Sequence, residues 1–291
     1  RLETITRPTD GPDSDLDILT EYGYDTAGWL DAISHSQDGI FLAEYGYTLD
    51  KIGNREEVDV TGTEVVTGTE NFEYNELDQL TDASYVETGT AIFTYDANGN
   101  RKTVKSGAVT TTYNYDVLGQ LDGITSDDPL VDPLVIEYDN NGNRKRVLDG
   151  ATTLREYTWD WSNRLTSVDV GGLDTDYAYL GDDTRLSQTT SAGTTDYLIE
   201  RQSGLPQVID DGDSAYLHDV TGNSMAIDGT SSDATYPLSD ALGSTRLTLD
   251  GTGTPLGSTD WDAWGNERYS DGTGYEFGYT GQQYDESADL Y

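Results

Sequence analysis

A short unit recurs about every 20 residues along most of this chain, and that periodicity restricts the possible folds more than any other feature. Each unit contains an aromatic residue, usually Tyr, then Asp or Asn, two variable residues and usually Gly. The unit is clearest at residues 95–101, 115–121 and 138–144, weaker at 24–28, 74–78 and 159–165, and degenerate around Tyr47, Tyr179, Tyr197, Tyr216 and Tyr236. Such self-similarity predicts an array of identical small elements.

Each unit has the sequence of a β-hairpin. Aromatic residues precede the turn at alternate positions, as in Phe93 and Tyr95, which places both rings on one face of a sheet. The turn Asp can accept hydrogen bonds from the following amides, and the Gly three residues later can adopt positive φ, as in a type I turn that closes with a glycine bulge. The predicted structural turn residues are Asp25 with Gly28, Asp96 with Gly99, Asp116 with Gly119, Asp139 with Gly142, and Asp240 with Gly243.

Two exceptions agree with this interpretation. Asn163 and Asp78 replace the glycine in their units, and Asn and Asp tolerate the left-handed region better than other non-glycine residues. We therefore predict an all-β fold, a continuous strip of antiparallel β-hairpins that curves into a spiral, shell or tube. About eleven hairpins give about 22 strands, a strip of about 105 Å at the usual strand spacing.

Composition excludes several functions. With 55 Asp and Glu against 16 Lys and Arg, the net charge of −39 opposes binding to phosphate backbones or anionic membranes. The chain has no Cys and two His, and no apolar run approaches the roughly 20 residues that cross a bilayer. We expect no catalytic residues, no enzyme activity, no nucleic-acid partner and no membrane insertion. The acidity fits a salt-adapted (halophilic) protein or an ordinary acidic, soluble surface.

The repeats and the C-terminal part resemble a known family. The Tyr-Asp units resemble the YD repeats of the Rhs (rearrangement hot spot) family, which also occur in bacterial toxin-complex shells and teneurins. Residues 236–247, 261–266 and 279–291 resemble, in order and spacing, the Rhs repeat-associated core. The resemblance covers roughly residues 22–291 and implies a non-catalytic structural scaffold. Family members continue past the final Leu-Tyr pair to an Asp-Pro-x-Gly stretch where many cut themselves, so no autoproteolytic aspartate or toxin cargo is carried over to these residues.

We expect three regions without a true domain boundary between them. Residues 1–21 form an acidic lead-in or edge strand, residues 22–235 the hairpin array, and residues 236–291 a truncated core-like module. Residues 275–279 alternate aromatics with little charge, which predicts an open sheet edge there that another chain or a flanking segment covers.

Ligand candidates are few. Asp96, Asn98 and Asn100, and equally Asp139, Asn141 and Asn143, place oxygen atoms at alternate positions as calcium loops do, although plain turn chemistry explains the same residues. Calcium is thus the one cofactor that the sequence raises; we otherwise expect none. Trp261 and Trp264 flank Asp262 and could stack on a sugar, but packing within the last hairpins is the favoured interpretation. Arginines that follow the turns are expected to stack on rings or to pair with turn carboxylates.

Three functions fit these features. The first is a structural β-scaffold of a secreted or cell-surface protein, a shell segment that encloses or presents other parts. The second is an extracellular filament or sheath subunit joined head to tail through its sheet edges, and the third is a glycan-binding adhesin. The expected partners are other copies of the chain, or flanking parts of the same polypeptide, and glycans for the adhesin. The expected location is extracellular or at the cell surface.

Overall fold

The computed structural model describes residues 1–8, 17–201, 206–218, 224–228 (backbone only), 234–272, 275–285, 287–288 and 290. The chain divides into two compact units, each described by itself. Unit 1 comprises Arg1–Thr90 and Asp213–Tyr284, and unit 2 comprises Ala91–Gly212 and Asp285–Tyr291. This division follows contacts in space, so segments far apart in the chain belong to the same unit.

Unit 1 contains two rows of antiparallel strands. In the first row each strand pairs with the next along the chain. Its strands are β1 (Thr4–Pro8), β2 (Asp17–Tyr24), β3 (Leu30–Gln37), β4 (Ile40–Leu49), β5 (Arg55–Gly62), β6 (Gly68–Tyr74) and β7 (Leu80–Tyr85). The second row, which we call the inner sheet, contains β21 (Ser214–His218), β22 (Ser224–Asp228), β23 (Ala234–Ser239), β24 (Thr245–Leu249), β25 (Pro255–Trp261) and β26 (Glu267–Gly272), followed by a 3-10 turn at η1 (Tyr279–Gly281).

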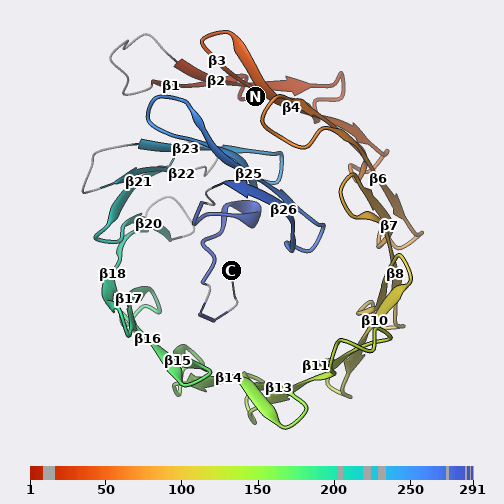
Figure 1. Cartoon of the computed structure of the whole chain (residues 1–291), viewed down its shortest axis with the longest axis vertical. Coiled ribbons are helices and arrows are strands. Elements are labelled where there is room, and N and C mark those ends of the chain that lie inside the picture. Colours follow the sequence, from red (N-terminus) through yellow and green to blue (C-terminus); the bar gives the residue numbers. More distant parts are fainter. Residues whose placement is uncertain are drawn as a thin grey trace. The chain divides into compact units, whose positions relative to one another are not determined.

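Unit 2 continues the same hairpin pattern, and Figure 1 shows β10 to β18 following one another. Its strands begin with β8 (Gly89–Tyr95), which straddles the division, and then run β9 (Arg101–Ser106), β10 (Val109–Tyr115), β11 (Leu121–Ser126), β12 (Leu134–Tyr138), β13 (Arg144–Asp149), β14 (Thr152–Trp159), β15 (Leu165–Val170), β16 (Leu173–Tyr179), β17 (Arg185–Thr190), β18 (Gly193–Asp196), β19 (Leu198–Glu200) and β20 (Gln207–Asp210). The predicted all-β fold of antiparallel hairpins is confirmed. The described residues contain 26 strands rather than about 22, because several strands of three to five residues escape the count of repeats.

The Asp-x-x-Gly turns have one recurring geometry, for which 96–99 is representative. Asp96 Oδ1 accepts hydrogen bonds from the amides of Asn98 and Asn100 at 2.8 and 2.9 Å, and the Gly99 amide donates to the Asp96 carbonyl at 3.1 Å. Gly99 has φ 88°, and the strand register shifts just before the turn, between Thr94 and Tyr95. A side chain at that φ would be strained, which explains why glycine recurs there.

In several hairpins an aromatic residue just before the turn connects the hairpin to the preceding one. The Tyr138 hydroxyl donates to the Leu121 carbonyl at 2.9 Å, and Leu121 is the second residue after the glycine of the preceding turn. Equivalent bonds join Tyr115 to Arg101, Trp159 to Arg144, Tyr179 to Leu165, and, in the inner sheet, Trp261 to Thr245. An indole N–H therefore replaces a phenol O–H in the same role. Each of these five residues satisfies a carbonyl at the start of the returning strand of the preceding hairpin.

Each unit has its own core. In unit 1 Ile18 and Leu42 of the first row pack against Tyr236, Leu238 and Leu247 of the inner sheet. In unit 2 Ile136, Val147, Tyr157, Val168 and Tyr177 pack together with Ala288 from the C-terminal segment. The aromatic residues before the turns thus contribute to both a core and a hydrogen-bond ladder.

The open sheet edge expected at residues 275–279 is a misprediction. These residues form no strand; Phe277 is buried, with its ring 5.1 Å from that of Tyr216, and its carbonyl accepts a 2.6 Å hydrogen bond from Thr245. Unit 1 therefore covers this segment with its own inner sheet. Asp10, Asp13 and Asp15 of the acidic lead-in lie outside the described residues, and Asp17 begins β2. No helix in the described part of the chain is long and apolar enough to span a bilayer.

Candidate functional site

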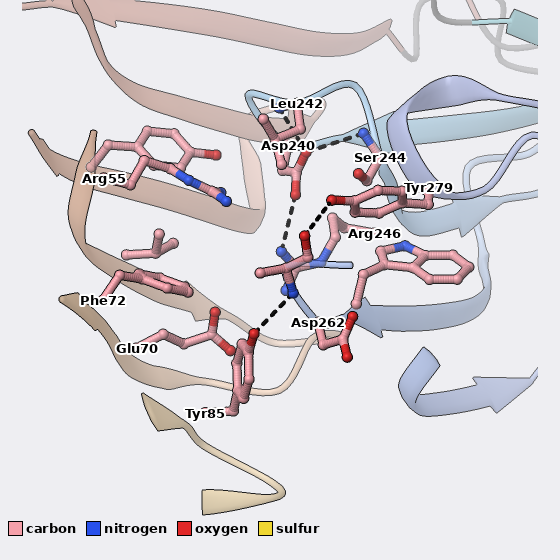
Figure 2. Close-up of a pocket in the computed structure, with 14 residues that line it drawn as sticks. Arg55, Glu70, Phe72, Tyr85, Asp240, Leu242, Ser244, Arg246, Asp262 and Tyr279 are labelled. Atoms are coloured by element: carbon pink, nitrogen blue, oxygen red, sulfur yellow. Dashed lines mark hydrogen bonds and ion pairs between the residues drawn. The ribbon is translucent and has the colours of Figure 1, made fainter. Parts of the chain in front are cut away.

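The inner sheet meets the first row of unit 1 at a pocket that brings together distant parts of the chain (Figure 2). Strands β4 to β7 provide one wall, and the turns that follow β23 and β25 provide the other. The pocket is rich in aromatic rings, which come from both walls: Tyr47, Phe72, Tyr85, Trp261 and Tyr279. The alternation of side chains along a strand explains the first wall. Glu70 and Phe72 are two residues apart and lie on the same face of β6, as Tyr45 and Tyr47 do on β4.

Two tyrosines of the first row bind the turns that follow β23 and β25 in the same way. The Tyr47 hydroxyl accepts the amide of Ala241 at 2.9 Å, and the Tyr85 hydroxyl accepts the amide of Ala263 at 2.9 Å. Ala241 and Ala263 each directly follow the turn aspartate, Asp240 or Asp262. The repeated turn therefore offers an amide at a fixed place, and a buried phenol on the facing wall binds it.

An arginine six residues after each turn aspartate completes each contact. Arg246 on β24 pairs with Asp240 at 3.3 Å and with Asp260, and its guanidinium lies 4.9 Å from the Tyr45 ring centroid. Its side chain is 6% exposed, and Nε donates to the Thr259 carbonyl at 3.2 Å. We call Tyr45, Tyr47, Asp240, Arg246 and Asp260 the first lock.

The second lock consists of Glu70, Tyr85, Glu87, Ala263 and Arg268. Arg268 on β26 pairs with Glu70 at 2.5 Å and with Glu87, and its guanidinium lies 4.2 Å from the Tyr85 ring centroid. The Arg268 side chain is 4% exposed and that of Glu70 is 7% exposed. A planar guanidinium can face a ring and still donate to two carboxylates at its edge, which suits arginine rather than lysine.

Burial controls the electrostatics of both locks. It raises the pKa of Tyr85 to about 12 and raises the pKa of Tyr47 further, so both phenols stay protonated. Burial also raises the pKa of Glu70 despite the opposing effect of Arg268. The pKa of Glu87 is raised first by burial and then by a hydrogen bond with the Asp260 carboxyl group. The pKa values of Glu70 and Glu87 are thus raised even though Arg268 pairs with both of them.

This arrangement is suited to holding two sheets together. Asp240 Oδ1 accepts the amides of Leu242 and Ser244, and Asp262 Oδ1 accepts those of Trp264 and Asn266. Within the described parts of the chain, no group of three or more His, Cys, Asp or Glu residues has the arrangement of a metal site. Each lock therefore combines a turn amide, a buried ion pair and an aromatic ring.

A separate anchor in unit 2 holds the C-terminal segment. The Tyr177 hydroxyl donates to Asp285 at 2.8 Å and lies 3.0 Å from the Ser287 hydroxyl, and Arg185 pairs with Asp285 at 3.3 Å. The Tyr157 hydroxyl donates to the Ala288 carbonyl at 3.3 Å, and Ala288 is 1% exposed. Asp285, Ser287 and Ala288 therefore bind the tyrosine-bearing face of unit 2 through a carboxylate, a hydroxyl and a small apolar side chain.

The calcium candidates lie in two turns in which the aspartate carboxylate oxygens already accept hydrogen bonds. Asp96 Oδ2 accepts from the Asn100 side-chain amide at 2.9 Å, and Asp139 Oδ2 accepts from that of Asn143 at 2.9 Å. The Asn141 amide reaches the next turn and donates to Asn163 at 3.1 Å. The pKa of each Asp is lowered chiefly by the Asn side-chain hydrogen bond. The other predicted turn glycines, Gly28, Gly119, Gly142 and Gly243, have φ of 97°, 81°, 89° and 79°.

Several residues of the locks were not singled out from the sequence. Glu70 had a usable signal, because it lies two residues before Phe72 and so shares the face of that ring. Arg268 also had one, because it lies six residues after Asp262, as Arg246 does after Asp240. Glu87 had none, since its contact with Arg268 depends on how the inner sheet lies on β6 and β7. Trp261, expected to pack in the last hairpins, is partly buried and bonded to Thr245, whereas the Trp264 ring is 42% exposed.

Comparison with known proteins gives consistent results. The family model for the teneurin YD-shell matches residues 46–291. The tRNA3(Ser)-specific nuclease WapA of Bacillus spizizenii and the tRNA nuclease WapA of Bacillus subtilis are each 30% identical over 234 residues, which are 75% of this chain and 9% of each relative. The chain thus spans less than a tenth of the length of these relatives.

Solved structures show the same fold. The Tc holotoxin pore of Photorhabdus luminescens matches with a TM-score of 0.65 at 16% identity, over 97% of this chain and 17% of that one. The TcdB2–TccC3 complex without its hypervariable C-terminal region matches with a TM-score of 0.58 at 18% identity, over 92% of this chain and 16% of that one. With its hairpin repeats and a family match over most of its length, the chain belongs to the teneurin YD-shell family and is a structural β-scaffold.

Proposed function

We propose that the chain is a wall segment of a larger secreted or cell-surface YD-repeat protein, which encloses or presents other parts of the same polypeptide. The observation that carries the proposal is the pair of locks, which fasten the inner sheet to the first row through buried arginines. A wall that carries its own fixed inner layer is suited to holding further chain in place. The small share of each relative that this chain spans supports a role within a larger protein.

The proposal assigns no reaction to these residues. The relatives named as tRNA nucleases match over 9% of their length, and the net charge of −39 here opposes RNA binding. Incubation of the purified chain with tRNA should therefore leave the tRNA intact. Cleavage that co-purifies with the chain would replace the scaffold proposal with an enzymatic one.

A test of the wall function uses the parent polypeptide and limited proteolysis. Segments outside residues 1–291 should resist cleavage in the wild type and become accessible when both locks are opened by Arg246→Met with Arg268→Met. Arg146→Met is the matched control, because Arg146 pairs with Glu137 on a strand surface where their side chains are 35% and 40% exposed. Equal accessibility in all three proteins would overturn the proposal.

Electron microscopy and glycan binding separate the alternatives. Discrete particles are expected, whereas fibres that grow from the isolated chain would favour a filament subunit. The filament interpretation used an open edge at residues 275–279, which unit 1 covers itself. Specific retention on immobilised glycans would favour an adhesin instead.

A further inference from the structure

His35 occupies a buried junction of four strands in unit 1, outside the two locks. It lies on β3 and is 2% exposed. Its Nδ1 is 3.0 Å from the Thr20 hydroxyl on β2, and its Nε2 is 3.1 Å from the Ser239 carbonyl at the end of β23. The same Thr20 hydroxyl accepts a hydrogen bond from Arg7 on β1 at 3.0 Å. One imidazole ring therefore joins the first row to the inner sheet.

These partners determine the protonation state of the ring. A carbonyl oxygen can only accept, so Nε2 must carry the proton and donate it to Ser239. Nδ1 is then free to accept the hydroxyl proton of Thr20, whose oxygen is already the acceptor for Arg7. The neutral imidazole thus has a donor on one side and an acceptor on the other, and both are satisfied.

A second proton would disturb every part of this junction. Nδ1 would become a donor that faces the proton of the Thr20 hydroxyl, in a site where Thr20 is 1% exposed. The new positive charge would lie beside Arg7. Tyr45 on β4 presents its ring edge-on at 6.1 Å, and Asp240 after β23 is paired with Arg246. Among the described residues no carboxylate is hydrogen-bonded to the ring, so no direct ion pair would compensate the charge.

We propose that His35 is an acid-sensitive latch, whose protonation at mildly acidic pH releases β23 of the inner sheet from β2 and β3. The device goes beyond the scaffold function, because it makes the attachment of the inner layer depend on the pH of the surroundings. Burial, with Arg7 adding to it, lowers the pKa of His35 to about 4. The released form, in which the ring reaches water, should regain an ordinary pKa near 6.5.

The sign and size of the effect follow from these two values. In the closed form β23 is attached to β2 and β3, and in the open form it is released. Because the open form binds the proton more tightly, the stability of the closed form relative to the open form is highest above about pH 6.5. This stability decreases as the pH falls towards 4. Between pH 7.5 and pH 5 the equilibrium constant for opening should rise roughly 30-fold through this one ring. Carboxyl groups elsewhere also titrate in acid, so the test compares variants at each pH.

Hydrogen exchange, corrected for the intrinsic pH effect, measures the opening of Ala234–Ser239. A change from pH 7.5 to pH 5 should raise the opening constant in the wild type and in His218→Gln by similar factors. In His35→Gln the factor should be about 30-fold smaller, because this variant has no imidazole at position 35. His218, the second of the two histidines in the chain, lies on β21 and is the matched control. An equal rise in His35→Gln would overturn the proposal.

A second measurement does not depend on the folding of His35→Gln. In His218→Gln, His35 is the single remaining histidine, so its imidazole can be titrated by NMR without ambiguity. The ring should stay neutral while β23 is protected and should gain its proton together with the loss of that protection. Titration near pH 6.5 with β23 still protected would show that the ring is not a latch.

Discussion

Single aromatic residues before the turns perform two tasks, since the ring fills the core and the polar tip binds the neighbouring hairpin. Tyr138 illustrates the second task through its hydrogen bond to the Leu121 carbonyl. Tyr113 lies two residues before Tyr115, the aromatic residue that directly precedes the turn of its hairpin. Its hydroxyl makes no hydrogen bond to the described residues, and the Arg101 guanidinium lies 4.4 Å from its ring centroid. Two tyrosines of the same repeat type therefore differ in the role of the hydroxyl.

We predict that Tyr138→Phe destabilises the protein by about 1 kcal/mol, because it removes one hydrogen bond and leaves a half-buried carbonyl without its donor. Tyr113→Phe should change the free energy of unfolding by less than about 0.5 kcal/mol, since the ring is retained and no hydrogen bond is lost. Urea denaturation of both variants measures the difference. Equal losses would contradict the ladder of hydrogen bonds between hairpins.

The turn glycines allow a test of backbone strain without steric contact. Gly119 has φ 81°, and a Cβ there would meet no atom within 4 Å; a Cβ at Gly181 also meets none, but its φ is not in the positive range. Gly119→Ala should cost about 1 to 2 kcal/mol, the price of a side chain in the left-handed region. Gly181→Ala should be neutral or slightly stabilising, because it restricts the unfolded chain. Thermal unfolding of both variants measures the difference. A larger loss of stability for Gly181→Ala than for Gly119→Ala would refute the turn assignment.

At the scale of elements, the locks fasten one sheet to another through buried charge. Arg268 neutralises Glu70 and Glu87 in a region where all three side chains are at most 15% exposed. Removing one partner of such a group leaves the other charges buried, which is costly, whereas a pair on the surface contributes little. The locks should therefore dominate the attachment of β25 and β26.

We predict that Arg268→Met destabilises unit 1 by about 3 to 5 kcal/mol, and that adding Glu70→Gln and Glu87→Gln recovers part of the loss. Arg146→Met, which breaks a half-exposed pair, should cost less than about 1 kcal/mol. Denaturant unfolding followed by the fluorescence of the five tryptophans, which include Trp261 on β25, measures the loss. A loss for Arg268→Met no larger than for Arg146→Met would show that the second lock is not structural.

At the scale of the whole molecule, the net charge of −39 opposes compaction. Exposed charges are screened over a Debye length of about 10 Å at 0.1 M salt and about 3 Å at 1 M. We predict that the midpoint of thermal unfolding rises between 0.1 and 2 M NaCl. A midpoint that stays constant or falls as NaCl increases would contradict salt adaptation. Calcium is titrated separately at constant ionic strength, so that screening and calcium binding can be distinguished.

The hairpin array and its turns could be predicted from local sequence patterns. The alternation of rings, the Asp-x-x-Gly pattern and the exceptions at Asp78 and Asn163 are local properties, and both exceptions adopt positive φ, of 58° and 61°. Such features depend on backbone geometry within a few residues, so they can be predicted without knowledge of the neighbouring elements. The resemblance to the YD-repeat family rests on the same local patterns.

The contacts between distant residues could not be predicted in this way, because they depend on how the sheets pack. Arg268 and Glu70 are separated by 198 positions, and His35 and Ser239 by 204, so no local pattern links them. The burial of Phe277 by the inner sheet likewise replaced the open edge that its alternating sequence suggested. The physical reason is that period two specifies the face on which a side chain lies, whereas packing between sheets specifies what that face contacts.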